Sequence, residues 1–270
     1  MRLAGRRTAA LALAGMLAVG LGACGDDDDG DDAADAAPSA DDGELAAAED
    51  NQEFCDAFTA TDQAMTNAPE DPAEMEAYAA AEITPHLGTV RDTAPDSLSE
   101  PVGVMVDAVE AMLADGDFGA FETPEFLAAQ GEVYPALGDT CGLPTVTATA
   151  VDFRYEGVPE TVEAGLTVFV IDNQSAAGEA HEMGVVRLKD DVTLSAEEIL
   201  ALSEEEAQQY IEAFGGGMYA PAGEVGGTTV DLAPGRYLYA CFIPTGSVNG
   251  QEGTGAPHFT EGMFGEFTVE

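Results

Sequence analysis

The chain from about residue 144 to its C-terminus is a series of short strand-like segments separated by turn signals. Apolar, β-branched and aromatic residues alternate with polar ones or run together there, which is typical of strands that bury one or both faces. The expected strands are 145–155, 166–172, 182–188, 228–232, 236–243 and 265–269. Several short strands joined by turns favour a β-sandwich.

A segment of different character interrupts these strands at about 195–227. Ser195 with Glu198, and Ser203 with Glu206, have the spacing of capping boxes and predict two helix starts. The three glycines at 215–217 are expected to end this helical piece. We therefore predict a helical insertion that covers one end of the sandwich.

Four residues of the strand-rich segment have side chains that bind soft transition metals: His181, Cys241, His258 and Met263. A thiolate and two neutral imidazoles hold copper in a trigonal plane that suits both Cu(I) and Cu(II), and a distant thioether adjusts the redox potential. Cys241 lies near the end of one predicted strand, and His258 and Met263 precede the next. One loop can therefore present three ligands at one end of the sandwich, and His181 can reach the same end from another strand.

Residues 144–270 resemble the cupredoxins, such as plastocyanin and azurin, in three places. Residues 172–181 are similar to the loop that delivers the first histidine ligand, and 237–241 to the strand that ends in the cysteine ligand. Residues 258–263 keep the His-x4-Met spacing with a glycine before the methionine. The resemblance implies a Greek-key β-sandwich with one type 1 (blue) copper ion. It also implies strong ligands at His181, Cys241 and His258 and a weak axial ligand at Met263.

Two features depart from that family. Sixteen residues separate Cys241 from His258, where blue copper loops are much shorter, and this loop is rich in glycine and polar residues. Glu182 follows His181 where plastocyanin and azurin have an asparagine that helps to order the ligand loops. The long loop either loosens the site, serves for docking or directs His258 elsewhere. A metal-free sandwich and a site for another metal are the alternatives to copper.

The preceding segment, 45–142, is expected to be a small bundle of about four helices, which makes the whole chain α+β and multidomain. Apolar residues recur there at helical spacing, as in the stripe Val102, Met105, Val106, Val109, Met112 and Leu113. Cys55 and Cys141 flank this segment and are predicted to form a disulfide, which suits an oxidising compartment. The frame from Cys55 to Cys141 resembles small helical domains of actinobacterial lipoproteins, and that resemblance implies no known activity.

The N-terminus has the pattern of a secretory signal. Three arginines precede an apolar run that ends in Leu-Gly-Ala-Cys at 21–24. This run resembles the lipobox of bacterial lipoproteins, which implies removal of residues 1–23 and lipidation of Cys24; an ordinary signal peptide is the alternative. Residues 24–44 should form a disordered acidic tether. We therefore expect a protein anchored by lipid to the cell membrane on its extracytoplasmic side.

The chain is very acidic, with 8 Lys and Arg against 52 Asp and Glu and a formal net charge of −44. This charge repels nucleic acid, which is therefore not an expected partner. It also repels anionic lipid, so the contact with the membrane is expected to come from the lipid anchor alone. An acidic surface of this kind would attract a basic redox partner. Adaptation to high salt is the alternative explanation of the same composition.

Three histidines in the whole chain exclude several classes of enzyme. A multicopper oxidase and a copper nitrite reductase need more histidines, and zinc hydrolases usually need two or three with an open position for water. The sequence also lacks a nucleophile elbow and a phosphate-binding glycine loop. We therefore expect a non-enzymatic, tethered protein that carries single electrons on one copper ion. The alternatives are copper capture or delivery, and a metal-free lipoprotein that binds a cell-surface partner.

Overall fold

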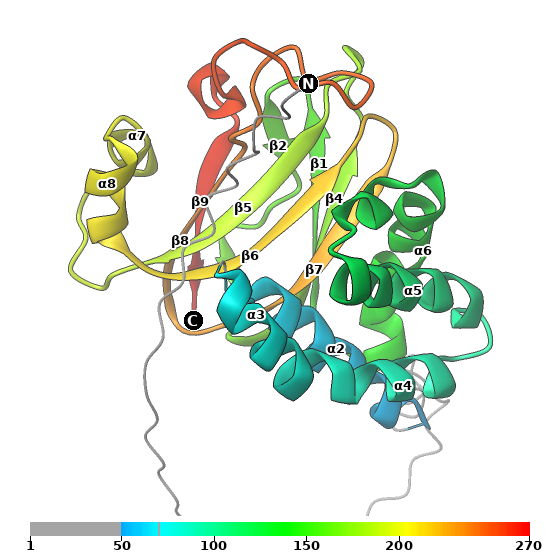
Figure 1. Cartoon of the computed structure of the whole chain (residues 1–270). Coiled ribbons are helices and arrows are strands. Elements are labelled where there is room, and N and C mark those ends of the chain that lie inside the picture. The colour runs from blue at the N-terminus through cyan, green and yellow to red at the C-terminus, as the bar shows by residue number, and fades with distance from the viewer. Residues whose placement is uncertain (1–49, 70) are drawn as a thin grey trace, which may run out of the picture.

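The computed structural model describes residues 50–69 and 71–270, so the predicted signal peptide (1–23), the lipidation site Cys24 and the predicted acidic tether (24–44) lie outside the described residues (Figure 1). Among the described residues, no helix combines the length and the apolar character that a membrane span requires. The chain is a mixture of helices and sheets, with the helices first and a β-sandwich after them.

The helices of the first part pack their apolar faces against one another. In chain order they are α2 (Gln52–Thr66), α3 (Pro72–Tyr78), the π-helical turn η1 (Ala79–Ile83), α4 (Thr84–Thr93), α5 (Ser99–Asp115), the 3-10 turn η2 (Phe118–Glu122) and α6 (Pro124–Cys141). Phe54, Ile83, Val102 and Leu137 are fully buried in their shared core. The apolar stripe predicted between residues 102 and 113 lies on α5 and faces this core.

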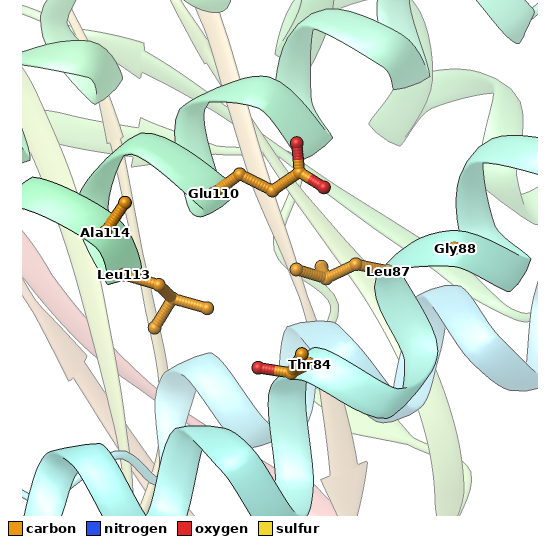
Figure 2. Close-up of a pocket in the computed structure, with 6 residues that line it drawn as sticks. All are labelled: Thr84, Leu87, Gly88, Glu110, Leu113 and Ala114. Carbon is orange, nitrogen blue, oxygen red and sulfur yellow. The ribbon is translucent and has the colours of Figure 1, made fainter.

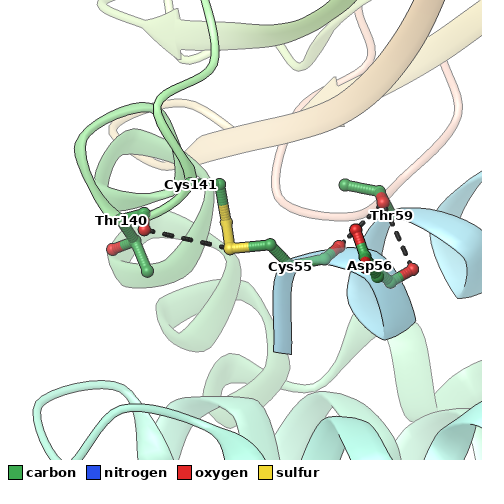
Figure 3. The surroundings of a disulfide bond; sticks show 5 residues. All are labelled: Cys55, Asp56, Thr59, Thr140 and Cys141. Atoms are coloured by element: carbon green, nitrogen blue, oxygen red, sulfur yellow. Dashed lines mark hydrogen bonds between the residues drawn. A yellow bond between two sulfur atoms is a disulfide. The ribbon is translucent and has the colours of Figure 1, made fainter. Parts of the chain in front are cut away.

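The predicted disulfide between Cys55 and Cys141 is confirmed, and it joins the first turn of α2 to the last residue of α6 (Figure 3). The two Cα atoms are 5.7 Å apart, which is a normal separation for a disulfide. Around it, the Thr59 hydroxyl donates to the Cys55 carbonyl at 2.7 Å. The bond therefore closes almost the whole helical part into one covalent loop.

Two sheets form the sandwich. One has the strand order β2-β1-β4-β7 and the other the order β3-β9-β8-β5-β6. The strands are β1 (Thr145–Val151), β2 (Arg154–Glu156), β3 (Thr161–Val162), β4 (Gly165–Asn173), β5 (His181–Leu188), β6 (Ile211–Ala220), β7 (Val225–Leu232), β8 (Gly235–Ala240) and β9 (Phe264–Val269). Alternate side chains point between the sheets, where Phe169, Val185 and Phe267 are fully or almost fully buried. The sandwich predicted from the strand pattern is confirmed.

The prediction of a helical insertion over 195–227 is wrong in its second half. Ser195 and Ser203 do form capping boxes, and they start the short helices α7 (Ala196–Leu200) and α8 (Glu204–Ala207). The 3-10 turn η3 (Gln208–Tyr210) follows, and then β6 pairs along β5. The glycines at 215–217 lie inside β6. A Cβ at Gly216 would come within 3.1 Å of the Val230 side chain in the facing sheet, so the packing of the two sheets favours glycine there. Close approach of the two sheets, and not a helix end, explains Gly215 and Gly216.

The two short helices also do not cover an end of the sandwich. Ile199 of α7 packs with Leu188, Leu238 and Ala240, whose side chains form a separate cluster from the one between the sheets. They therefore cover the outer face of the five-stranded sheet beside β8 (Figure 1).

The helical part and the four-stranded sheet share a hydrophobic core. Val168 and Val170 of β4 belong to the same buried cluster as the helices, and Tyr134 of α6 lies against β7. A Cβ at Gly227 of β7 would be 2.4 Å from the Tyr134 ring, so only glycine permits this approach. Figure 1 shows the helices lying along this face of the sandwich. The division at residue 142 into two domains stays a prediction.

A carboxylate at this junction links the two parts. Asp62 of α2 accepts hydrogen bonds from the Tyr134 hydroxyl at 2.6 Å, from the Thr229 amide at 2.5 Å and from the Thr229 hydroxyl at 2.7 Å. The Thr228 hydroxyl donates to it at 3.3 Å. Burial raises the pKa of Asp62 above its usual range, and these hydrogen bonds act in the opposite direction.

We expect Asp62→Ala to lower the free energy of unfolding by about 2–4 kcal/mol, because it leaves the Thr229 amide and the Tyr134 hydroxyl buried without an acceptor. A raised pKa in the folded state means that Asp62 contributes most below its unfolded pKa, and that this contribution falls as the pH rises through the folded pKa. The difference between wild type and variant should therefore be larger at about pH 4 than at about pH 7 in urea unfolding. The exposed Asp56→Ala on the same helix is the matched control. Equal stability of Asp62→Ala and wild type would contradict this role.

Candidate metal centre

The structure brings His181, Cys241 and His258 together at one end of the sandwich. All three side chains are 0 % exposed, and their candidate ligand atoms lie within 4.8 Å of one another. The two histidine Nδ1 atoms are 3.1 Å apart, and Cys241 Sγ is 3.4 Å from His258 Nδ1. The long loop therefore does not direct His258 elsewhere, and Nδ1 is the nitrogen that each histidine turns toward the cluster.

Strand pairing explains why these residues meet. His181 begins β5 and Cys241 follows β8, and because the two strands are antiparallel these positions fall at the same end of the sheet. His258 begins the 3-10 turn η4 (His258–Glu261), and the Phe259 amide after it donates to the Cys241 carbonyl at 2.9 Å. The Cys241 amide in turn donates to the Met263 carbonyl at 3.1 Å. Backbone hydrogen bonds therefore fix the spacing of the ligand-bearing segments.

Met263, the predicted axial ligand, lies between η4 and β9. Its side chain is 0 % exposed and packs in the same cluster between the sheets as Cys241. Its amide donates to the His258 carbonyl at 3.2 Å, which closes the turn that carries both residues. The fold thus places Met263 beside the cluster, and its role as a ligand stays a prediction.

Glu182, which stands where the resembled family has asparagine, connects two of these segments. Its amide donates to Cys241 Sγ at 3.5 Å, and its carboxylate accepts from the Phe242 amide at 3.0 Å. Burial raises the pKa of Glu182. The Tyr155 hydroxyl also donates to the Glu182 carbonyl. The glutamate therefore ties the residue after His181 to the residue after Cys241.

Burial also sets the protonation of the three cluster side chains. It lowers the pKa of His181 to about 4, with the nearby His258 acting in the same direction. It lowers the pKa of His258 as well, although Glu179 opposes the shift. It raises the pKa of the Cys241 thiol to about 12. At neutral pH both imidazoles are thus neutral, which is the form that binds metals, and the thiol would release its proton to solvent when a cation binds its sulfur.

The donor set fits a single transition-metal ion. Bonds from such an ion to imidazole nitrogen and thiolate sulfur are about 2.0–2.3 Å long, so donor atoms just over 3 Å apart can share one ion. Soft thiolate and imidazole ligands select copper or zinc over magnesium or calcium. The Nε2 atoms of both histidines are buried without a well-aligned hydrogen bond, which is unusual in a protein core. The meeting of two Nδ1 atoms and one sulfur is what fits a metal ion here.

Phe153 lies beside the site, although the sequence pattern predicted it to be inside a continuous strand. The predicted strand 145–155 is broken into β1 and β2 by Asp152 and Phe153, which have φ values of 36° and 67°. Such left-handed backbone is costly for a bulky residue and often marks a functional constraint. The turn places the Phe153 ring 4.8 Å from the His258 ring, edge to face. No local signal in the sequence distinguished this turn from a continuous strand.

Glu179 is the second site residue that the sequence analysis did not single out. The residue is only 7 % exposed, and its Oε2 lies 3.4 Å from His258 Nε2. This distance is within ion-pair range but lacks the alignment of a full hydrogen bond. The only sequence signal was its place two residues before His181.

An aromatic pair lies at the surface next to two of the cluster residues. Phe242 follows Cys241 and is 51 % exposed, and Phe259 follows His258. Their ring centroids are 5.2 Å apart in an edge-to-face arrangement. An exposed aromatic side chain, Phe242, and a half-buried one, Phe259, thus each lie one residue from a candidate ligand.

A cleft of about 320 Å³ lies between α4 and α5, in the helical part (Figure 2). Leu87, Leu113 and Ala114 are apolar residues of its lining, and Glu110 is the only titratable residue in that lining. The Glu110 carboxylate pairs with Arg91 at 3.1 Å, so no free acid or base faces the cleft. The cleft offers no catalytic group, and it is formed by different elements from the metal cluster.

Comparison with known proteins gives structural likenesses only. No family model matches the sequence, and no curated protein matches it. Auracyanin B is 24 % identical, with a TM-score of 0.31, over 47 % of this chain and 88 % of that one. Auracyanin A, a "blue" copper protein from Chloroflexus aurantiacus, is 19 % identical with a TM-score of 0.28 over 47 % and 98 %. Rusticyanin from Thiobacillus ferrooxidans is 21 % identical with a TM-score of 0.27 over 47 % and 76 %.

Proposed function

We propose that this protein binds one copper ion at His181, Cys241 and His258, with Met263 as a weak axial ligand, and that it carries single electrons. The observation that supports this most directly is the convergence of two Nδ1 atoms and one sulfur, all fully buried. Copper bound there would accept and release one electron by alternating between Cu(I) and Cu(II).

The residues around the cluster suit an electron carrier because they hold the ligands in place. Backbone hydrogen bonds connect the Cys241, His258 and Met263 segments, and Glu182 connects the His181 segment to them. A rigid ligand set changes little between the two oxidation states, so little reorganisation accompanies electron transfer. The three cluster side chains are fully buried and the Phe153 ring lies edge to face against His258, which suits a site that a substrate does not enter.

The same burial supports retention of the ion over its exchange. Residues 243–257, which follow Cys241, are folded on themselves: the Thr245 amide donates to the Ala256 carbonyl, and the Ser247 hydroxyl donates to the Pro244 carbonyl. A capture or delivery protein would expose at least one ligand, whereas all three are covered here. We therefore favour electron transfer over copper delivery.

A visible absorption spectrum during titration with Cu(II) tests the proposal, using the protein from about Leu45 onward. We expect an intense blue thiolate-to-copper band that saturates at one equivalent. Zn(II) has no redox chemistry and gives no such band. When it is added before copper, it should reduce the blue band that Cu(II) then produces, because it occupies the same ligands. A weak spectrum with no defined stoichiometry would exclude a type 1 site.

We also propose that lipid on Cys24 holds the protein at the outer side of the membrane, which the sequence pattern alone supports. With Cys24→Ala, we expect the protein to leave the membrane fraction and enter the soluble extracytoplasmic fraction or to stay as uncleaved precursor. Membrane fractionation with an immunoblot measures this. Wild type that is soluble from the start would contradict the anchor. The basic redox partner expected from the net charge stays a prediction.

A further inference from the structure

Glu179 is a buried carboxylate that contacts the cluster without belonging to its donor set. Both of its carboxylate oxygens accept from the Gly246 amide, at 2.9 and 3.0 Å. Its Oε2 also lies 3.4 Å from His258 Nε2, on the side of the imidazole that faces away from His181 and Cys241. One side chain therefore contacts both the long loop and a candidate ligand.

The backbone around Glu179 makes the same connection. The Ala180 amide donates to the Ser247 carbonyl at 2.8 Å, and Glu179 forms an isolated β-bridge with Val248. On the other side, the Asn173 amide group donates to the Glu179 carbonyl at 2.9 Å. The loop 243–257 is thus attached to the segment that leads into His181, and Glu179 lies where the two meet.

We propose that Glu179 is a positioning residue for the metal centre. Its carboxylate lies 3.4 Å from His258 Nε2, short of an aligned hydrogen bond, and a small rotation of the imidazole lets it accept the Nε2 proton, which leaves the Nδ1 lone pair of that histidine free to face His181 and Cys241. It also holds the loop closed through the Gly246 amide. The identity of the metal rests on the proposed function, whereas the effect on His258 and on the loop does not.

Two physical consequences follow. A histidine whose Nε2 proton is bonded to a carboxylate is fixed in one tautomer and one orientation, and its free nitrogen becomes a stronger metal ligand. A buried negative charge near the metal also favours the higher oxidation state, because its attraction to a cation is strong in a low-dielectric surrounding. Glu179 should therefore raise metal affinity and lower the reduction potential.

The first test uses the metal-free protein, so that it does not depend on copper. Imidazole ¹⁵N shifts measured by NMR should show His258 in the Nε2–H tautomer in wild type. In Glu179→Ala the two tautomers of His258 should mix, and the loop 243–257 should be cleaved faster by a protease. Glu252→Gln, an exposed change in the same loop, should alter neither result. An Nδ1–H tautomer in wild type, or the same tautomer in wild type and Glu179→Ala, would overturn the proposal.

The second test separates charge from shape. Glu179→Gln keeps an oxygen for the Gly246 amide and removes the charge, so it should keep the loop protected while the reduction potential of the copper-loaded protein rises. Glu179→Ala should weaken Zn(II) binding about 10- to 100-fold, as loss of such a partner of a ligating histidine typically does. Unchanged potential in Glu179→Gln together with unchanged Zn(II) affinity in Glu179→Ala would overturn the positioning role. If wild type binds Zn(II) but gives no blue copper band, the proposed function fails. The role of Glu179 is then decided by the tautomer of His258 in the metal-free protein.

Discussion

We expect Cys241→Ser to remove completely the blue band that we propose for the copper-loaded protein. The band arises from charge transfer between a thiolate and copper, and Cys241 is the only free cysteine among the described residues. A serine hydroxyl has nearly the same shape, but it does not ionise at accessible pH and is a poor ligand for a soft metal. The fold should survive, because the hydroxyl can still accept from the Glu182 amide that now contacts the sulfur.

Met263→Leu is the matched control for this prediction. It removes a thioether from the same core cluster while keeping the thiolate and both imidazoles, so the band should persist and the reduction potential should shift. Absorption spectra and voltammetry of the two variants, recorded beside wild type, give both readings. A Cys241→Ser protein that keeps its colour would show that the thiol is not a ligand. An uncoloured wild type would contradict the type 1 site and would leave the metal-free sandwich and a site for another metal as the remaining alternatives.

Removal of the disulfide is the second large effect. The double variant Cys55→Ala/Cys141→Ala should lose about 4–5 kcal/mol of unfolding free energy in the chain-entropy model, because the bond closes a long loop. The separation between the two cysteines is 86 residues. Alanine keeps the small, apolar character of Cys55, which lies in the core of the helices, so most of the loss comes from greater freedom in the unfolded chain.

Urea unfolding with and without a reducing agent measures this effect. Reductant should shift the unfolding midpoint of wild type toward that of the double variant and should leave the double variant unchanged. The copper spectrum should be retained in the double variant, because the disulfide joins α2 to α6 and no metal-cluster residue lies on either helix. A double variant within about 1 kcal/mol of wild type would show that the unfolded state is already compact without the bond.

Local patterns in the sequence were enough for a strand that is buried on both faces. Burial on both faces gives 166–172 its continuous apolar run, and the structure has β4 at Gly165–Asn173. Capping boxes at Ser195 and Ser203 were read correctly, because the hydrogen bonds of a capping box are made within four residues. The disulfide pairing was also predicted, since only two cysteines flank the helical segment.

The same local reading failed where the partner of a residue lies far away in the sequence. Glycines inside β6 looked like a helix end, because the need for them comes from Val230 in the opposite sheet. Phe153 looked like the next position of a strand, whereas contact with His258 accompanies a left-handed turn there. Asp62 gave no signal at all, since its donors are on α6 and β7.

The candidate site shows the same division. The amino-acid sequence by itself determined the chemistry, because the types of the side chains and their places next to strand ends specify two imidazoles, a thiol and a thioether. Only the tertiary structure decided that the Nδ1 atoms and the sulfur meet, that a loop of this length closes over them, and that Glu179 and Glu182 hold the loop and the ligand strands. Contacts between distant segments depend on how whole sheets pack, and no short stretch of sequence contains that information.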